Sequence, residues 1–344
     1  MYIIFLELGL KLLCPNGVLS FITPSKYLSA EYATALRSLI LRDYSLNMIS
    51  DFSDIRVFKS AGVSTIISQL SNKTQQSNIK FKKYKTTTDV SSTRTYDNDV
   101  LSLMPNNLWG YLLSENVDLF MKIFNKSVTI DEYADVNACS TAAEAEEYES
   151  HLSETKTGNA FKYINNGTIQ RYIQLWGVKS IKTGRMLHPY LGQGCISNRR
   201  REMFAQEKLV FVKLAKCPQV YLDEHGEFAS ANTNMVYNLR DYEYKFLLGY
   251  LNSSLFNFLY HTMFGGLSML GTIQMQAPQI KKSLIPILND RTQQQPIIDL
   301  VDKIIYAKRV NPQADTSKWE RQIDQKVYDI YGLDEAERKL IEEM

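Results

Sequence analysis

The sequence predicts an α/β fold that continues into a mixed α+β region and ends in helices. Three observations support this prediction. Over residues 1–70, segments with helical apolar spacing alternate with short runs rich in Ile and Val, which is an α/β pattern. Short strand-like runs separated by turn residues follow in the middle of the chain. After residue 289, apolar residues recur at helical spacing and predict two amphipathic helices.

Composition excludes several classes of protein. The chain has 344 residues, of which 44% are hydrophobic and 22% are charged, and its formal net charge is +2. These values are those of an ordinary globular protein long enough for two domains. The four cysteines form no CxxC pair and the four histidines are scattered, so we expect reduced thiols in a cytoplasmic protein and no metal site. No apolar run reaches the length of a membrane span, so no membrane partner is expected.

The first elements follow from apolar spacing. "YIIFLELGLKLL" reads as a helix with Phe5, Leu8 and Leu12 on one face, and "SAEYATALRSLIL" reads as a second helix capped by Ser29. "GVLSFITP", "SLNMISDF" and "VSTIISQLSN" read as strands, and the lysine-rich run at 80–85 reads as a protected edge strand or a phosphate contact. The sequence contains neither GxGxxG nor GxxxxGK[ST]. A nucleotide-type fold is therefore predicted without its phosphate-binding turn.

A polar loop between the last two of these strands contains Phe58, next to Lys59, Ser60 and Gly62. Loops carry binding residues more often than core residues do, so this ring could face a ligand. The alternative is that Phe58 folds back on the end of the sheet as a lid.

These first seventy residues resemble a known family. "YIIFLELGLKLLCPNGVLSFITPSKYLSAEYATALRSLI" and "ISDFSDIRVFKSAGVSTIISQL" look like the C-terminal half of an adenine-N6 DNA methyltransferase of the type IIG restriction–modification class, which carries a TaqI-like specificity domain. The resemblance implies a partial Rossmann-like methyltransferase sheet in this part of the chain. In the family, the Asn-Pro-Pro-Tyr motif and the S-adenosylmethionine loop lie upstream of the matching helix, and this sequence has neither. We therefore expect the full-length parent to use S-adenosylmethionine, and this chain alone to bind no cofactor well and to be inactive.

The resemblance also assigns roles to two aromatic residues. In the family, the aromatic residue at the position of Phe58 stacks on the flipped target adenine. An enzyme that modifies a base must extrude it from the duplex, and the extruded base needs an aromatic partner. Phe5 matches an aromatic residue that packs on the adenine ring of the methyl donor. An ordinary core position on an amphipathic helix explains Phe5 about as well.

A basic window spans residues 155–216, where twelve Lys and Arg residues face only Glu202 and Glu207. Clustered positive charge with interleaved aromatic residues is typical of a nucleic-acid surface, although a solvated basic loop has the same composition. Arg side chains read guanine edges, and Lys side chains mostly contact phosphates. The predicted DNA-binding residues are Lys179, Lys182, Arg185, Arg199, Arg200 and Arg201.

The sequence thus predicts three domains. Residues 1–95 are the C-terminal remnant of the methyltransferase domain, residues 96–288 are a TaqI-like target-recognition domain, and residues 289–344 form helices packed on it. In the last segment, Ser317 and Glu320 form a predicted capping box.

The predicted function is sequence-specific recognition of double-stranded DNA. The partner would be the missing methyltransferase half, or, in the alternative, a separate methyltransferase or defence complex that this chain serves as a non-enzymatic specificity subunit. An α/β enzyme unrelated to DNA would explain neither the basic window nor the Phe58 loop. The remnant sheet should also expose an open parallel edge, so we expect a covering partner segment, self-association or marginal stability in that region.

Overall fold

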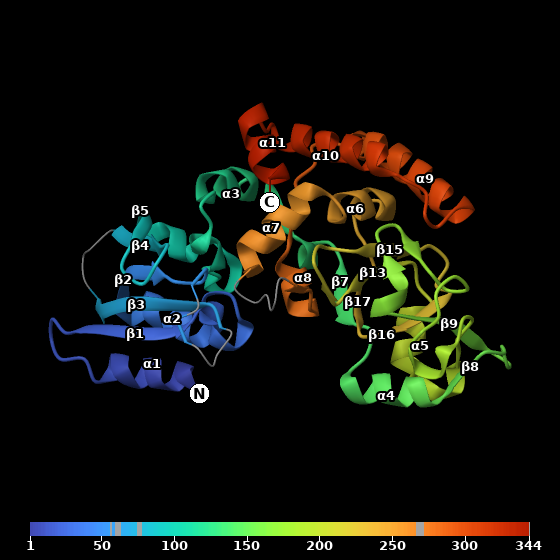
Figure 1. Ribbon diagram of the computed structural model, residues 1–344, viewed down its shortest axis with the longest axis horizontal. Coiled ribbons are helices and arrows are strands. Elements are labelled where there is room, and N and C mark those ends of the chain that lie inside the picture. The colour runs from blue at the N-terminus through green and yellow to red at the C-terminus, as the bar shows by residue number, and fades with distance from the viewer. Residues whose placement is uncertain (56, 59–62, 74–77, 266–271, 344) are drawn as a thin grey trace. The chain divides into compact units, whose positions relative to one another are not determined.

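The computed structural model describes residues 1–55, 57–58, 63–73, 78–265 and 272–343. It separates into two compact units, one of residues 1–120 with 261–268 and one of residues 121–260 with 269–344. The molecule is a mixed α/β protein with several small sheets and a C-terminal helical region (Figure 1). This confirms the coarse prediction of a mixed α/β chain that ends in helices, whereas the Rossmann-like character of the first sheet stays a prediction. The predicted domain boundaries stay a prediction.

A five-stranded sheet in the order β1-β3-β2-β4-β5 forms the first unit. Among these strands, β2 and β4 pair in parallel and the other neighbours pair antiparallel. The expected open parallel edge is therefore wrong, because both outer strands, β1 and β5, are in antiparallel pairs. The strands are β1 (Val18–Pro24), β2 (Tyr44–Asp51), β3 (Thr65–Asn72), β4 (Asn78–Tyr84) and β5 (Val90–Asp97).

The lysine-rich strand is β4, and its predicted place at a sheet edge is also wrong. It lies between β2 and β5, and it buries Ile79 and Phe81 while Lys80 between them is exposed. This alternation is the period-2 pattern of a strand with one face in the core. By this alternation, Lys80 and Lys82 lie on the outward face of an inner strand.

Helix α1 (Tyr2–Lys11) buries Leu6 and Leu10, whereas Phe5, Leu8 and Leu12 are exposed. The apolar face recognised in the sequence is thus the outward face of the helix. Helix α2 (Thr34–Asp43) follows a 3₁₀ turn, and Ala33 occupies its N-cap position. The predicted Ser29 cap is wrong, because the Ser29 hydroxyl donates instead to the carbonyl oxygen of Met263 at 3.0 Å.

Two four-stranded sheets form the centre of the second unit, in the orders β15-β13-β17-β7 and β16-β9-β12-β8. Asn232, whose φ is +56°, is the single residue between β16 and β17, so the chain changes sheets there. The strands are β6 (Ser127–Thr129), β7 (Asp135–Ala138), β8 (Leu152–Ser153), β9 (Ala160–Asn165), β10 (Ile169–Gln170), β11 (Ile173–Gln174), β12 (Tyr190–Gly192), β13 (Lys208–Val212), β14 (Leu214–Ala215), β15 (Val220–Asp223), β16 (Phe228–Ala231), β17 (Thr233–Tyr237), β18 (Ile273–Gln274) and β19 (Leu284–Pro286).

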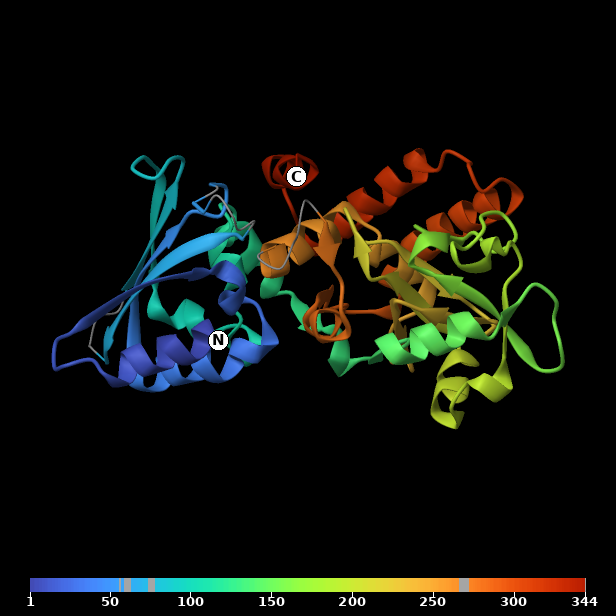
Figure 2. The same ribbon diagram turned by 60° about the horizontal axis from the view of Figure 1, so that its bottom comes forward.

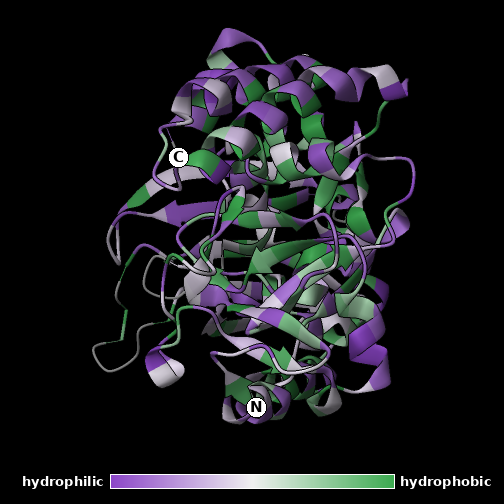
Figure 3. Cartoon of the chain, turned by 90° about the vertical axis from the view of Figure 1, so that its right-hand side faces the viewer, coloured by the Kyte–Doolittle hydropathy of each residue, from purple (hydrophilic) through white to green (hydrophobic). Residues whose placement is uncertain are grey.

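Helices pack around these sheets and form the C-terminal region, where α9 and α10 lie side by side against α6 (Figure 2). A Cβ added at Gly249 of α6 would lie 2.7 Å from a methyl of Ile297, so this close approach requires glycine. Strands inside the unit are largely hydrophobic, and the outer helices carry hydrophilic stretches (Figure 3). The helices are α3 (Val117–Phe124), α4 (Ala142–Ser150), α5 (Asn198–Phe204), α6 (Tyr244–Leu251), α7 (Ser254–Phe264), α8 (Ala277–Lys282), α9 (Gln295–Val310), α10 (Ser317–Tyr331) and α11 (Glu335–Glu342).

The predicted C-terminal helices are confirmed, but the predicted Ser317–Glu320 capping box is wrong, because the N-cap residue of α10 makes no side-chain capping hydrogen bond. Thr316, not Ser317, is the N-cap of α10, and its hydroxyl donates to the Glu320 carboxylate at 2.6 Å. Within the described residues, no helix is both long and apolar enough to cross a membrane. The same part of the chain holds no cluster of His, Cys, Asp and Glu side chains that could bind a metal ion.

Candidate functional site

The basic window contains cations of two kinds. Eight of its twelve Lys and Arg residues have no acidic partner within the described residues. The other four form ion pairs with acids from outside the window, which are Lys162–Glu227 at 2.9 Å, Arg171–Glu320 at 3.5 Å, Arg200–Glu144 at 2.8 Å and Lys208–Asp223 at 2.5 Å. The local excess of charge counted along the sequence therefore overstates the charge available to a ligand.

Lys208 is a structural anchor. Its side chain is 0% exposed and pairs with Asp223, which also accepts hydrogen bonds from the backbone N–H groups of Glu227 and Phe228 at 3.1 and 3.0 Å. Burial lowers the pKa of Lys208, because a charged amine is less stable away from water. This pair joins β13 to the turn before β16.

Arg200 links α5 to α4. Its guanidinium donates to both carboxylate oxygens of Glu144, at 3.0 and 2.8 Å, and to the carbonyl oxygen of Ala138. The bidentate hydrogen bonds from Arg200 lower the pKa of Glu144 from 4.5 to about 2. Arg200 thus holds α5 against α4.

The loop between β11 and β12 presents three of the predicted DNA-binding residues, Lys179, Lys182 and Arg185. All three are exposed and have no ion pair within the described residues. Backbone hydrogen bonds hold the loop, and one of them runs from the Ile181 N–H to the Met186 carbonyl at 2.9 Å. Gly184 and Arg185 turn it through positive φ angles of 64° and 51°.

The Glu154 carboxylate secures the far end of the same loop. It accepts the backbone N–H groups of Leu187 and His188 at 3.0 and 2.9 Å. The three cations therefore lie on a loop whose backbone is fixed by hydrogen bonds within it and at its end.

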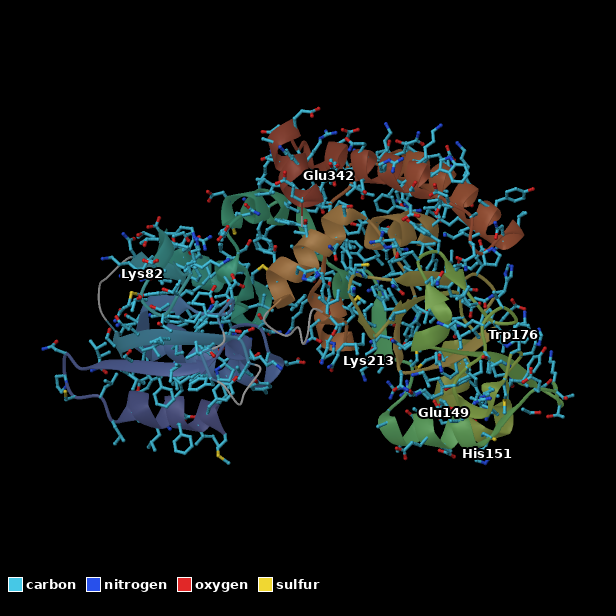
Figure 4. The ribbon with its side chains drawn as sticks, viewed as in Figure 1. Lys82, Glu149, His151, Trp176, Lys213 and Glu342 are labelled. Carbon is cyan, nitrogen blue, oxygen red and sulfur yellow. The ribbon has the colours of Figure 1, made fainter. Side chains whose placement is uncertain are left out.

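Lys179 and Lys182 line a pocket of about 460 Å³, together with Glu149, Asn165, Asn166, Thr168 and Asn232. A second pocket of about 360 Å³ shares Asn166 and Asn232 and adds Lys213, Gln274 and Gln276. The two pockets adjoin at the shared residues, and we call them together the amide cleft. Figure 4 labels two of its lining residues, Glu149 at the end of α4 and Lys213.

Asn166 holds the floor of the amide cleft in place. Its side-chain oxygen accepts the backbone N–H groups of Lys213 and Leu214 at 2.7 and 3.2 Å, and its amide nitrogen donates to the Leu214 carbonyl at 3.2 Å. The short strand β14 then pairs with β18, and the buried Asn234 amide donates to the Met275 carbonyl at 2.6 Å. This set of bonds fixes the backbone that carries Gln274 and Gln276.

Asn232 and Gln276 are the exposed amides of the cleft. The Asn232 side chain makes no hydrogen bond within the described part of the chain, and Gln276 donates to Gln274 at 3.2 Å. An amide offers one donor and one acceptor group side by side, so these two residues can recognise a ligand that presents the complementary pair.

Sequence reasoning missed these amides, although one signal was available. In "IQMQ", Ile273 and Met275 are buried at 1% and 0% exposure. Strand alternation then places Gln274 and Gln276 together on the opposite face. Nothing in the sequence near Asn232 indicates that it lies beside Asn166.

The three adjacent arginines do not line the amide cleft. Arg199 is exposed on α5, and Arg201 bonds to Asn198 and lines a different pocket of about 320 Å³ with Phe161 and Glu202. The predicted DNA-binding residues are therefore divided between the cleft loop and α5.

The two aromatic candidates lie in the first unit, and both rings are open to solvent. Phe58 follows β2 and is 45% exposed, while Phe5 on α1 is 53% exposed. Lys59, Ser60 and Gly62 lie outside the described residues. This exposure does not support Phe58 as a lid on the sheet or Phe5 as a core residue. The roles of both rings in ligand binding stay predictions.

Comparisons with known protein families agree with the resemblance seen in the sequence. Residues 1–58 match the Eco57I restriction-modification methylase model, and residues 157–287 match the TaqI-like C-terminal specificity domain model. The amide cleft draws most of its lining from the second match. The resemblance to restriction-modification methylases with a TaqI-like specificity domain is thereby confirmed. No curated protein sequence matches the chain.

Solved restriction-modification enzymes were found among the structures that match this chain. The type IIL enzyme MmeI, in complex with DNA, matches with a TM-score of 0.52 and 10% identity over 95% of this chain and 50% of its own. The type IIG restriction endonuclease BpuSI matches with a TM-score of 0.39 and 13% identity, over 96% of this chain and 49% of its own. A nuclease-deletion mutant of the Type ISP enzyme LlaGI matches with a TM-score of 0.40 and 11% identity, over 85% of this chain and 30% of its own. The MmeI likeness supports a shared fold, and the chain spans about half the length of the first two enzymes.

Proposed function

We propose, from the presence of a methylase segment and a specificity-domain segment in one chain, that the protein is the DNA-recognition part of a restriction-modification enzyme. The parent enzyme would be a site-specific adenine-N6 DNA methyltransferase of the type IIG class. The observation that supports the proposal most strongly is the amide cleft, which combines lysines and exposed amides within the specificity-domain segment.

The chemistry of the cleft suits the edges of base pairs. A bidentate Asn or Gln recognises adenine through N6 and N7, and Lys recognises guanine or contacts phosphates. The Glu149 carboxylate, held by the Thr183 hydroxyl at 2.7 Å, can accept the amino group of cytosine. The loop cations, with Arg185 beside the cleft lysines, would neutralise the DNA backbone around these contacts.

In this proposal the five-stranded sheet is the C-terminal portion of a Rossmann-like methyltransferase sheet. Phe58 receives the flipped adenine, and base–aromatic stacking there contributes about 1–3 kcal/mol. Phe5 packs on the methyl donor, which the full-length parent binds through residues that this sequence lacks. The parent would act in the cytoplasm, in keeping with four unpaired cysteines within the described residues.

The exposed face of α1 supports a protein partner for the first unit. Ile4, Phe5, Leu8 and Leu12 are between 49% and 75% exposed, and they form one apolar stripe. Stripes of this kind mark contacts with other protein segments. The proposed partner that covers this stripe is the methyltransferase portion with the Asn-Pro-Pro-Tyr motif. It would belong to the same polypeptide or, in the alternative function, to a separate subunit for which this chain provides specificity.

Duplex binding by this chain tests the recognition role. We expect the affinity to fall steeply with salt and one sequence in a duplex library to bind more tightly than the rest. Absence of binding at about 50 mM salt, where phosphate contacts are strong, would overturn the proposal.

Base flipping is tested separately, after the methyltransferase portion has been added. A 2-aminopurine at the target adenine should become fluorescent with the wild-type chain. Phe58→Ala should reduce this signal, whereas Phe58→Trp should retain it. An unchanged signal in Phe58→Ala would remove the stacking role.

A further inference from the structure

A second basic surface lies on the C-terminal helices, outside the segment that matches the specificity domain. A groove of about 640 Å³ runs between α9 and α10, and four cations line it, Lys303, Lys318, Arg321 and Lys326. Asp299 is the acid among its lining residues, and its carboxylate accepts the Gln295 amide at 2.7 Å. The groove therefore carries an excess of three positive charges.

These four cations differ from other cations of the C-terminal helices. Within the described residues, none of the four has an acid within ion-pair distance. By contrast, Arg309 pairs with Glu224 at 2.5 Å, Arg338 pairs with Asp329 at 2.8 Å, and Lys308 donates to the Ala314 carbonyl at 3.5 Å. Like charges gathered without partners repel one another, so their arrangement costs stability unless an anion binds. The contrast points to a ligand that supplies negative charge.

The spacing of the cations suits an extended polyanion. On α10, Lys318, Arg321 and Lys326 lie at positions i, i+3 and i+8, on one side of the helix. Eight residues of helix span about 12 Å. Along one strand of duplex DNA, about 12 Å of axis holds three to four phosphates, at about 3.4 Å each. Lys303 adds a charge from α9, on the other wall of the groove.

The lining favours phosphates over base edges. Lys side chains are flexible point charges, and Gln322 and Gln325 add amide groups that can donate to phosphate oxygens. None of the described residues that line the groove is aromatic, so an extruded base has no stacking partner there.

We propose that the groove between α9 and α10 binds the phosphate backbone of duplex DNA next to the recognised sequence. This inference rests on the proposed DNA-recognition function. It assigns the C-terminal helices a contact that adds affinity, whatever the sequence of the flanking DNA.

The test uses the full chain and a variant with Lys303→Gln, Lys318→Gln, Arg321→Gln and Lys326→Gln. Affinity is measured across salt for a duplex limited to the recognised site and for one extended at both ends. On the extended duplex, the slope of log affinity against log salt should become shallower by up to about 3.6, at about 0.9 for each lost contact. The preference between target and non-target sequences should not change.

A matched control removes four cations of the same C-terminal segment that have partners, by Arg291→Gln, Lys308→Gln, Arg309→Gln and Lys339→Gln. Their partners are Asp241, the Ala314 carbonyl, Glu224 and Glu343. This control changes the net charge equally and should leave the salt slope close to wild type. Replacing Lys303, Lys318 and Lys326 by Arg should also retain binding.

The outcomes separate the two proposals. Equal salt slopes in the groove variant and the wild type, with sequence preference intact, would overturn the groove proposal and leave DNA recognition standing. Equal losses in the groove variant and the matched control would show a general charge effect and would also overturn it. A wild-type chain that binds neither duplex would overturn both proposals.

Discussion

The loop around Lys182 and the helix α5 look alike in the sequence, since each brings three Lys or Arg residues within eight positions. The structure separates them. The loop holds its backbone through Glu154 and leaves its cations exposed, whereas α5 uses Arg200 to bind Glu144 and Arg201 to bind Asn198. Charge density along a chain therefore does not measure surface charge. Acids that are distant in sequence neutralise cations when the fold brings them together.

The strongest test concerns the buried ion pair between Lys208 and Asp223, which is another case of a cation neutralised by an acid from a different element. Asp223→Ala leaves the Lys208 ammonium buried without a partner, so the free energy of unfolding should fall by about 3–5 kcal/mol. Glu227→Ala is the control, because it breaks only the half-exposed pair with Lys162 and should cost about 1 kcal/mol or less. Chemical denaturation measures both. Similar losses in the two variants would show that Lys208 is no more a structural anchor than Lys162.

The exposed side of the comparison is tested by Lys179→Gln, Lys182→Gln and Lys213→Gln together. Stability should stay near wild type, because these side chains have no ion pairs within the described residues. DNA affinity should fall, with a salt slope shallower by about 2.7, from three contacts at about 0.9 each. The control is Lys156→Gln, Lys216→Gln and Lys339→Gln, an equal charge change outside the cleft. If the control weakens binding as much, the cleft has no special role.

Base reading is tested by Asn232→Gly and Gln276→Ala. Glycine tolerates the positive φ at position 232, so Asn232→Gly removes the amide and keeps the turn. Each variant should lower discrimination against one wrong base pair by about 1–3 kcal/mol. Competition binding with single-position duplex variants measures this effect. Uniform weakening over all sequences would instead assign these amides to backbone contacts.

The smallest expected effect is that of Arg200→Gln. We expect a loss of about 1–2 kcal/mol at pH 7, since the pair is partly exposed to water. The pKa of Glu144 is lowered from 4.5 to about 2, so the ion pair contributes its full stability above pH 4.5. That contribution disappears as the pH falls toward 2, and the two curves of unfolding free energy against pH should converge there. A difference that stays constant down to pH 2 would contradict the ion-pair explanation.

The order of local elements was available from the sequence because neighbouring residues determine it. Apolar spacing predicted α1, β1, β2 and β3 close to their observed bounds, and strand alternation in "IQMQ" could have indicated Gln274 and Gln276. The face that α1 buries could not be read, since Leu6 and Leu10 are as apolar as Leu8 and Leu12. Which leucine is buried depends on where the helix lies against the sheet.

The mixed α/β character, the family resemblance and the place of the basic window could be read from the sequence, because each depends on residue types at short spacing. Which cations remain exposed, and which amides lie beside them, depends on the tertiary fold. Asn166 and Gln276 are 110 positions apart, yet both line the amide cleft because β14 pairs with β18. Glu144 and Asp223 neutralise cations from other elements in the same way. Such long-range pairings arise from sheet registry and core packing, which local patterns along the chain do not encode.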